Sequence, residues 1–271
     1  MDGVGLTSLW VAAMRAEETD RPDRLISDPF ARALAGPEGF DVMRRGDPPT
    51  AFRPPVVVVR TRFYDETIEA ALARGLRQLV LVAAGMDARA FRLDFPSGTR
   101  VFELDQPAVL SYKAERLGDA KPRTERVAVP VDLREDWPAA LRAAGFDAGR
   151  PTFWLVEGLT PYLPEADVKG VLARIDALAA PGSEVLFDVA GKSVLESPYM
   201  RDRLAFVASL GAPWHFASDE PETLLEPLGW DVRVEDQGVV GHRYGRWPLP
   251  VFPRGTPGVP QSFFVHGTKR R

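Results

Sequence analysis

Three acidic side chains follow three apolar segments of the chain, each at the point where the segment ends. They are Asp105 after residues 100–104, Asp132 after residues 124–131 and Glu157 after residues 152–156. If these segments are neighbouring parallel strands, their carboxyl ends lie at one edge of a sheet, and the acids share one site there. A carboxylate in this position accepts hydrogen bonds from ribose hydroxyl groups, and several acids together favour a cationic ligand. The pattern therefore predicts a nucleoside site.

A sharp turn precedes the first of these acids. The apolar run 79–83 shows no polar alternation, as is typical of a strand buried on both faces, and it stops at Ala84, Gly85, Met86 and Asp87. Dinucleotide sites use G-x-G-x-x-G and P-loops use G-x-x-x-x-G-K-[ST], but neither motif occurs in the chain. A nucleoside without phosphate, of which S-adenosylmethionine is the common one, fits better. The alternative is a structural turn followed by a solvated acidic strand end, and these residues alone leave both open.

A resemblance to a known family bears on this choice. The stretches LVAAGMDARAFRL and VFELDQPAVLSYK occur in the order found in the leucine carboxyl methyltransferase family, as do TSLWVAAMRAEE, DPFARAL, VRTRFYDE, VEGLTPYL and DEPETLLEPLGW. The chain most resembles the bacterial branch that includes tetracenomycin-type polyketide carboxyl methyltransferases. One position departs from the family, because Ala83 stands where glycine is usual. We expect its methyl group to crowd the ligand.

The resemblance implies S-adenosyl-L-methionine as cofactor and assigns residues to it. The cofactor-binding residues are expected to be Arg60, Ala83, Gly85, Asp105, Asp132, Leu133 and Glu157. In this assignment Arg60 binds the α-carboxylate and Glu157 accepts from the methionyl ammonium group. Asp132 accepts from the exocyclic amine of adenine and Leu133 packs on the ring, although Asp132 could also cap the next helix.

The helical phase of residues 56–75 separates two arginines. A buried stripe is predicted at Val57, Thr61, Tyr64, Ile68 and Leu72. Arg60 lies beside this stripe, and Arg62 is rotated well away from it. A carboxylate needs a planar guanidinium for bidentate binding. Arg60 therefore suits that role better, and Arg62 is expected to form a surface salt bridge.

Strands and helices alternate along the chain, which predicts an α/β fold with helices on both faces of a sheet. We expect a doubly wound, mostly parallel, seven-stranded sheet of the Rossmann-like class I methyltransferase type, in one domain over residues 1–271. Residues 1–53 and 191–218 are expected to cover the substrate. The expected strands are 79–83, 100–104, 124–131, 152–156, 184–189, 230–235 and 261–265. The expected helices are 6–18, a short one from Asp28, 56–75, 106–117, one from Pro164, 199–210 and 219–226, with irregular chain at 36–55 and 241–260.

Composition bounds the class of protein. The chain has 271 residues, 45% of them apolar, which is consistent with one large globular domain. With 34 basic and 38 acidic residues, the net charge is −4 and no long basic block occurs, so nucleic acid is an unexpected partner. There is no cysteine, basic leader or membrane-length apolar span. We expect a cytoplasmic protein without a metal or a membrane partner; a homodimer is left open.

The chemical class of the methyl acceptor can be inferred from the side chains that could activate it. A carboxylate with a pKa of about 4 is already a nucleophile at neutral pH, whereas a phenol with a pKa of about 10 usually needs a base. None of His215, His242 and His266 lies in a catalytic motif, and His215 is only a weak candidate base. Tyr162, Trp214 and His215 are the expected substrate-binding residues.

We therefore expect a carboxylate on a small aromatic or polyketide-like natural product. The aromatic residues expected to surround it are Trp10, Phe30, Phe40, Phe52, Trp214 and Phe216. A phenolic acceptor is the alternative, and Ala83 supports a second one, a cofactor-binding protein without transferase activity. Arg243, Arg246 and Arg254 could meet an acidic substrate but are expected to be solvated.

Overall fold

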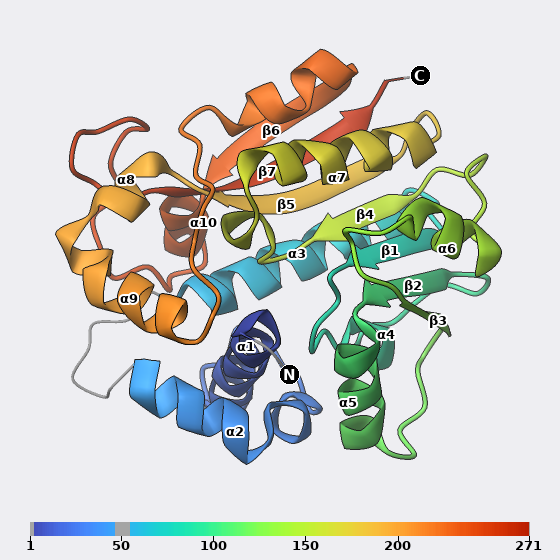
Figure 1. Ribbon diagram of the computed structural model, residues 1–271, viewed down its shortest axis with the longest axis horizontal. Coiled ribbons are helices and arrows are strands. Elements are labelled where there is room, and N and C mark those ends of the chain that lie inside the picture. The colour runs from blue at the N-terminus through green and yellow to red at the C-terminus, as the bar shows by residue number, and fades with distance from the viewer. Residues whose placement is uncertain (1–2, 47–54, 271) are drawn as a thin grey trace.

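A seven-stranded sheet forms the centre of the computed structural model, which describes residues 3–46 and 55–270 (Figure 1). The strand order is β3-β2-β1-β4-β5-β7-β6. Neighbouring strands are parallel except for β7, which runs antiparallel to both β5 and β6. The strands are β1 (Gln78–Val82), β2 (Arg100–Asp105), β3 (Glu125–Pro130), β4 (Phe153–Val156), β5 (Glu184–Ala190), β6 (Trp230–Asp236) and β7 (Ser262–Lys269). This architecture is the predicted one.

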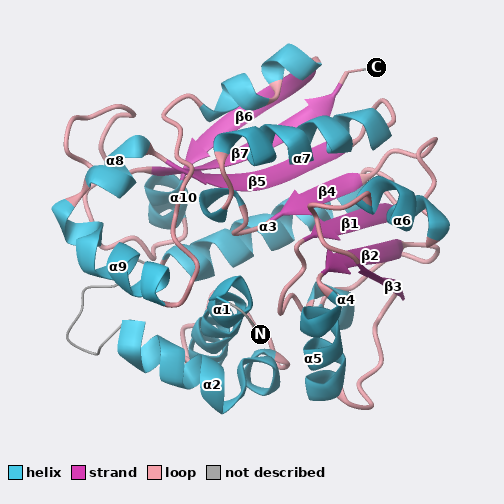
Figure 2. Cartoon of the chain, viewed as in Figure 1, coloured by secondary structure: helices cyan, strands magenta, loops and turns pink. Residues whose placement is uncertain are grey.

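Helices cover both faces of the sheet (Figure 2). The α-helices are α1 (Gly3–Thr19), α2 (Ala31–Gly46), α3 (Val56–Ala73), α4 (Arg89–Arg92), α5 (Pro107–Leu117), α6 (Trp137–Ala143), α7 (Glu165–Leu178), α8 (Lys192–Glu196), α9 (Arg201–Ser209) and α10 (Gln237–Arg243). Because side chains alternate along a strand, each strand contributes to two cores. Leu79 and Leu81 join the cluster beneath α1, α2 and α3, whereas Val80 and Val82 join the cluster beneath α6 and α7. The unbroken apolar run of β1 follows from this double burial.

Two segments differ from the prediction because of local backbone chemistry. Residues 37–46 are helical, not irregular: the chain turns at Gly36, with φ 57° and ψ −178°, and Pro37 then opens a second helical segment within α2. Residues 47–53 of the expected cover lie outside the described residues. The predicted helix 219–226 is also wrong, since two 3₁₀ turns, Pro221–Leu224 and Glu226–Leu228, take its place. Pro221 is compatible with a first helical turn, but Pro227 has no backbone N–H and so cannot continue an α-helical hydrogen-bond pattern past Glu226.

The connection between β6 and β7 contains a helix that sequence periodicity missed. The side chain of Asp236 accepts from the backbone N–H groups of Gly238 and Val239 at 2.7 and 3.2 Å, which starts the short helix α10. The remaining connection, residues 244–261, is irregular as expected. Within the described residues, no helix is both long and apolar enough to cross a bilayer.

Candidate functional site

A cavity of about 1520 Å³ opens at the carboxyl ends of the parallel strands. Its walls come from α1, from the strand ends, from the segment 189–207 and from the connection 247–262. A pocket for one small ligand measures about 300–1,000 Å³, so this cavity has room for two. Ligands of open α/β sheets bind at this edge.

Asp105 shapes the turn that follows β1. Its Oδ2 atom accepts from the backbone N–H of Gly85 at 2.7 Å, and its Oδ1 atom accepts from that of Gln106 at 2.7 Å. Burial raises the pKa of Asp105 in spite of these hydrogen bonds. Gly85 has φ +47°, and a Cβ atom added to it would lie 3.1 Å from Cβ of Ser8 on α1. A side chain at Gly85 would therefore be both strained and crowded by α1.

Ala83 lines the cavity beside this turn, with φ 57°. It is the one residue other than glycine with positive φ in the described part of the chain. The left-handed conformation costs an L-residue roughly 1–2 kcal/mol because Cβ approaches the following carbonyl oxygen. The backbone thus has the conformation that favours glycine, although the sequence places alanine there.

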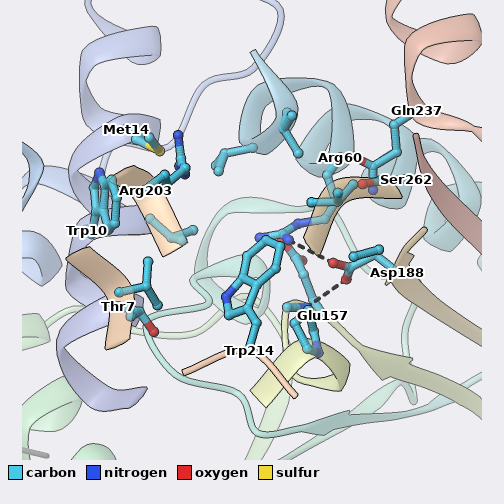
Figure 3. Close-up of a pocket in the computed structure, with 18 of the residues that line it drawn as sticks. Thr7, Trp10, Met14, Arg60, Glu157, Asp188, Arg203, Trp214, Gln237 and Ser262 are labelled. Carbon is cyan, nitrogen blue, oxygen red and sulfur yellow. Dashed lines mark hydrogen bonds and ion pairs between the residues drawn. The ribbon is translucent and has the colours of Figure 1, made fainter. Parts of the chain in front are cut away.

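Arg60 lies at the wall of the cavity between two carboxylates (Figure 3). Its Nε atom donates to Glu157 at 3.0 Å, and its Nη1 atom donates to Asp188 at 3.0 Å. Burial disfavours the charged guanidinium, but Asp188 and Glu157 outweigh this and raise the pKa of Arg60. A Cβ atom on Gly158 would lie 3.3 Å from two of the guanidinium nitrogens. As expected, Arg62 is exposed and pairs with Glu66 at 2.7 Å.

Asp188 was missed by the sequence reasoning, although a signal was present. It lies near the end of β5 and is therefore a further acid at the same edge of the sheet. Its Oδ1 atom accepts from the backbone N–H of Gly158 at 2.7 Å and from the hydroxyl of Tyr64 at 3.3 Å. Asp188 therefore fixes both Arg60 and the backbone turn that follows Glu157.

Arg89 is a second residue that the sequence reasoning missed, and its guanidinium binds three acidic side chains. Its guanidinium donates to Asp65 at 2.7 Å and to Glu157 at 2.7 Å, and it also pairs with Asp87. Burial alone would raise the pKa of Glu157, but Arg89 and Arg60 outweigh it and lower that pKa. Arg89 acts in the same way on Asp87, whose pKa falls to about 2. Glu157 is therefore anionic at neutral pH.

The structure does not bring Asp132 and Leu133 to the cavity. Asp132 lies two residues beyond the end of β3, and its carboxylate accepts from the guanidinium of Arg134 at 2.9 and 2.6 Å. The Arg134 side chain and backbone lower the pKa of Asp132 to about 2. Leu133 packs against the core cluster on the α6 and α7 face. Neither residue is among those that line the cavity.

The expected acceptor residues separate into two groups. Tyr162 and Trp214 line the cavity and pack edge to face, with ring centres 6.4 Å apart at 87°. His215 is exposed, and its ring does not line the cavity. Its backbone N–H donates to the carbonyl of Pro161 at 2.6 Å. His242 and His266 do not line it either. The expectation that His215 could act as base is therefore not supported by its position.

The expected aromatic wall is also only partly at the cavity. Trp10 lines it, with Phe206 edge to face at 5.6 Å, whereas Phe30, Phe40 and Phe216 do not. Phe216 is buried in the core cluster beneath α6 and α7, and Phe30 packs on Phe91. Phe52 lies outside the described residues. Sequence proximity to the cover did not indicate which rings face inward.

Arg243 and Arg254 of the last connection are exposed to solvent, as expected, whereas Arg246 is largely covered, and all three form ion pairs. Arg246 pairs with Glu18 of α1 and with Asp23 at 3.1 Å, which joins this connection to the N-terminal helix. Arg254 pairs with Glu222 at 2.8 Å, and Arg243 pairs with Glu235.

The sheet, its single-glycine turn and the strand-end acids define an S-adenosylmethionine-dependent methyltransferase fold. A model of the leucine carboxyl methyltransferase family matches residues 8–176, and the chain belongs to this family. A Mycobacterium avium protein carrying the name of an S-adenosyl-L-methionine-dependent methyltransferase is 43% identical, over 91% of this chain and 85% of its own. A Rhodococcus jostii protein with the same kind of name is 43% identical, over 93% and 91%. The cofactor is S-adenosylmethionine.

Solved structures agree on the fold. A Thermobifida fusca protein described as a methyltransferase superposes with a TM-score of 0.61 at 18% identity, covering 97% of this chain and 94% of its own. A Streptomyces avermitilis protein of the DUF574 family gives a TM-score of 0.59 at 16% identity, over 95% and 96%. At these identities the likeness shows the fold.

Proposed function

We propose that the protein transfers a methyl group from S-adenosylmethionine to a carboxylate of a small aromatic or polyketide-like natural product. The observation that supports this most is the composition of the cavity wall. Among the described residues, this wall carries aromatic and aliphatic side chains, such as Trp10, Tyr162 and Trp214, but no histidine and no lysine. A carboxylate acceptor is already ionised at neutral pH and needs no base.

The chain's own residues fit the cofactor at the turn. In this proposal the Asp105 carboxylate accepts from ribose hydroxyls, and the absence of a side chain at Gly85, which binds Asp105 through its backbone N–H, supports close approach of the nucleoside. Arg60 supplies a guanidinium for the methionyl carboxylate, and Glu157 supplies an anion for the ammonium group. Asp132 and Leu133 remain candidates for adenine only if Arg134 releases the carboxylate. S-adenosylmethionine, when bound, supplies the electrophilic methyl group.

Positioning is the main contribution that we assign to the protein. Methyl transfer is an in-line displacement, so the acceptor oxygen, the methyl carbon and the sulfur must be aligned while water is excluded. We propose that residues 1–53 and 191–218 form the cover that does this, within a single domain of residues 1–271. Support comes from α1, which packs over Gly85, and from Tyr199 and Phe206 of the second segment, which line the same cavity. We place the activity in the cytoplasm, with neither nucleic acid nor a membrane as partner.

The product distinguishes this proposal from its alternatives. The protein is incubated with labelled S-adenosylmethionine and candidate acids and phenols, and the product is treated with mild alkali. We expect release of labelled methanol, as from a methyl ester, and little effect of His215→Ala on turnover, since that ring lies outside the cavity. An alkali-stable aryl ether would instead show a phenol acceptor. Cofactor binding without any product from the whole panel would show a binding protein without transferase activity.

A further inference from the structure

Gln237 presents a buried amide to the cavity without a partner (Figure 3). The residue is only 3% exposed, and its Oε1 atom is buried without a hydrogen-bond partner. Among the described residues, no side-chain hydrogen bond is formed by this amide. A buried polar group left unpaired destabilises a folded protein, so a partner from outside the chain is indicated.

The backbone of Gln237 is held firmly, so the orientation of its amide is built into the fold. Asp236 caps the helix start by accepting from Gly238 at 2.7 Å. Trp247 packs against the same helix: a Cβ atom on Gly241 would lie 2.7 Å from the Trp247 ring, and one on Gly238 would lie 3.0 Å from its indole nitrogen. These contacts fix the position from which the amide reaches the cavity.

The position of Gln237 in the sheet places it away from the nucleoside end of the site, on the side of Arg60 and Ser262 (Figure 3). It follows β6, which is separated from β1 by β4, β5 and β7 in the strand order. At about 4.8 Å between neighbouring strands, the two ends are roughly 15–20 Å apart. Since Asp236 pairs with Phe263, the next position brings Gln237 beside Ser262, which also lines the cavity. The cofactor turn at Gly85 is thus at the opposite half of the site.

Two indole nitrogens on the cavity wall are also unpaired. Trp10 and Trp214 line the cavity, and the Nε1 atom of each is buried without a hydrogen-bond partner. An indole can only donate a hydrogen bond, whereas an amide both donates and accepts. The indoles can therefore donate to a carboxylate, whereas the Oε1 atom of Gln237 needs a donor, which a hydroxyl group supplies and a carboxylate does not.

We propose that Gln237 recognises a hydroxyl group on the acceptor. The Oε1 atom accepts a hydrogen bond from the hydroxyl group, and the Nε2 atom remains available to donate to an oxygen of the acceptor. That the acceptor is an acid rests on the proposed function above. Together, the two proposals make the substrate a hydroxylated aromatic acid. Gln237 then acts as a specificity residue, because an analogue that lacks the hydroxyl leaves the amide buried and unpaired.

Binding measurements test this separately from methyl transfer. S-adenosylhomocysteine fills the cofactor position without donating a methyl group, and 2-naphthoate and its monohydroxy derivatives are titrated by calorimetry. We expect at least one hydroxy derivative to bind about tenfold or more tightly than 2-naphthoate. Gln237→Met, which keeps the length of the side chain, should abolish this preference and leave the affinity for 2-naphthoate itself nearly unchanged. Val239→Met is the matched control, because Val239 is exposed on the same helix and lies off the cavity.

Thermal unfolding separates recognition from a structural role. An amide without a partner does not stabilise the fold, so the melting temperature of Gln237→Met should equal or exceed that of the wild type. Gln237→Leu serves as a second variant with the same expectation. The proposal is overturned if the wild type does not prefer any hydroxy derivative or if Gln237→Met keeps the preference. It is also overturned if Gln237→Met lowers the affinity for S-adenosylhomocysteine as much as the affinity for the hydroxy derivative. Failure to form a methyl ester would instead concern the proposed function and leave these binding results standing.

Discussion

The guanidinium of Arg60 joins Glu157 across 3.0 Å, although the two residues lie 97 positions apart in the sequence. A second bond of 3.0 Å to Asp188 engages another nitrogen of the same group. These two contacts fix the plane of the guanidinium at the ends of β4 and β5. Bidentate binding of a carboxylate requires a guanidinium that is held in a fixed plane.

The first prediction is that Arg60→Lys weakens cofactor binding. An ammonium group is a compact charge on a flexible stem and cannot keep both carboxylates and a ligand in one plane. We expect the Kd for S-adenosylhomocysteine to rise about tenfold or more, which corresponds to about 1.4 kcal/mol. Isothermal titration calorimetry measures this directly.

Arg62→Lys is the matched control for that change. Arg62 lies on the same helix, but its side chain is 46% exposed and pairs with Glu66 on the surface. Its replacement should leave the Kd within twofold or so, since exposed ion pairs contribute little. If Arg62→Lys were the damaging variant and Arg60→Lys were neutral, the assignment of Arg60 to the cofactor would be wrong.

The second prediction concerns pH and Asp105. A protonated carboxyl accepts hydrogen bonds from ribose less well, so binding needs the anionic form. Burial raises the pKa of Asp105 above its ordinary value of 3.8, so protonation begins at a higher pH than for an exposed aspartate. We expect the affinity for S-adenosylhomocysteine to fall as the pH is lowered from neutrality through this raised pKa. Asp87 stays ionised over that range, because its pKa lies at about 2.

Calorimetry across pH, repeated with two variants, identifies the titrating group. Asp105→Asn should bind about tenfold or more weakly at neutral pH and should lose the acid dependence, since an amide does not titrate there. Asp94→Asn should keep both the affinity and the dependence, because the Asp94 side chain is 96% exposed. An unchanged pH profile in Asp105→Asn would remove Asp105 from the ribose position.

The third prediction is that Ala83→Gly stabilises the protein and improves cofactor binding. Ala83 has φ 57°, a conformation that glycine adopts without the Cβ clash. Relief of that strain outweighs the greater freedom of glycine in the unfolded chain, so we expect the free energy of unfolding to rise by ~0.5–1 kcal/mol. Loss of the methyl group also widens the ligand approach, and the Kd for S-adenosylhomocysteine should fall.

Ala84→Gly tests whether the conformation at Ala83 is the cause. Ala84 is the adjacent buried residue, and its φ is not positive. Glycine there should lower the free energy of unfolding by about 1 kcal/mol, because only the entropic cost and the lost packing remain. Urea denaturation of both variants should therefore give shifts of opposite sign. Destabilisation in Ala83→Gly would show that the backbone strain is not the controlling factor.

The sequence alone could predict features that depend on local periodicity. Unbroken apolar runs located the buried strands β1 and β4, and the helical phase separated Arg60 from Arg62 correctly. Features that depend on distant partners could not be found in this way. Asp132 follows its strand as predicted, yet it pairs with the exposed guanidinium of Arg134 and does not line the cavity. The unpaired amide of Gln237 is likewise visible only once its surroundings are known.

Exposed apolar side chains gather at the mouth of the cavity. Six large apolar residues are exposed among those described: Val4, Tyr199, Val239, Leu249, Val251 and Phe252. All except Val239 line the cavity. Tyr199, at 89% exposure, belongs to the proposed cover, and Phe252, at 42%, belongs to the connection between β6 and β7. Exposed apolar surface that concentrates around an opening indicates a ligand-binding edge more than chance exposure does.

The last prediction is that these residues contact the apolar body of the acceptor as it leaves the cavity. Covering part of an aromatic side chain is worth ~1 kcal/mol, since full burial is worth about 1.5–3 kcal/mol. Tyr199→Ser and Phe252→Ser should each raise the KM for an aromatic acid several-fold and leave kcat nearly unchanged, because the reacting atoms lie deeper in the site. Val239→Ser, equally apolar and 41% exposed but off the cavity, should change neither constant. Steady-state kinetics on a short and a long aromatic acid measure the effect, which should be larger for the long one. If all three variants had the KM of the wild type, the acceptor would end inside the cavity and not reach its mouth.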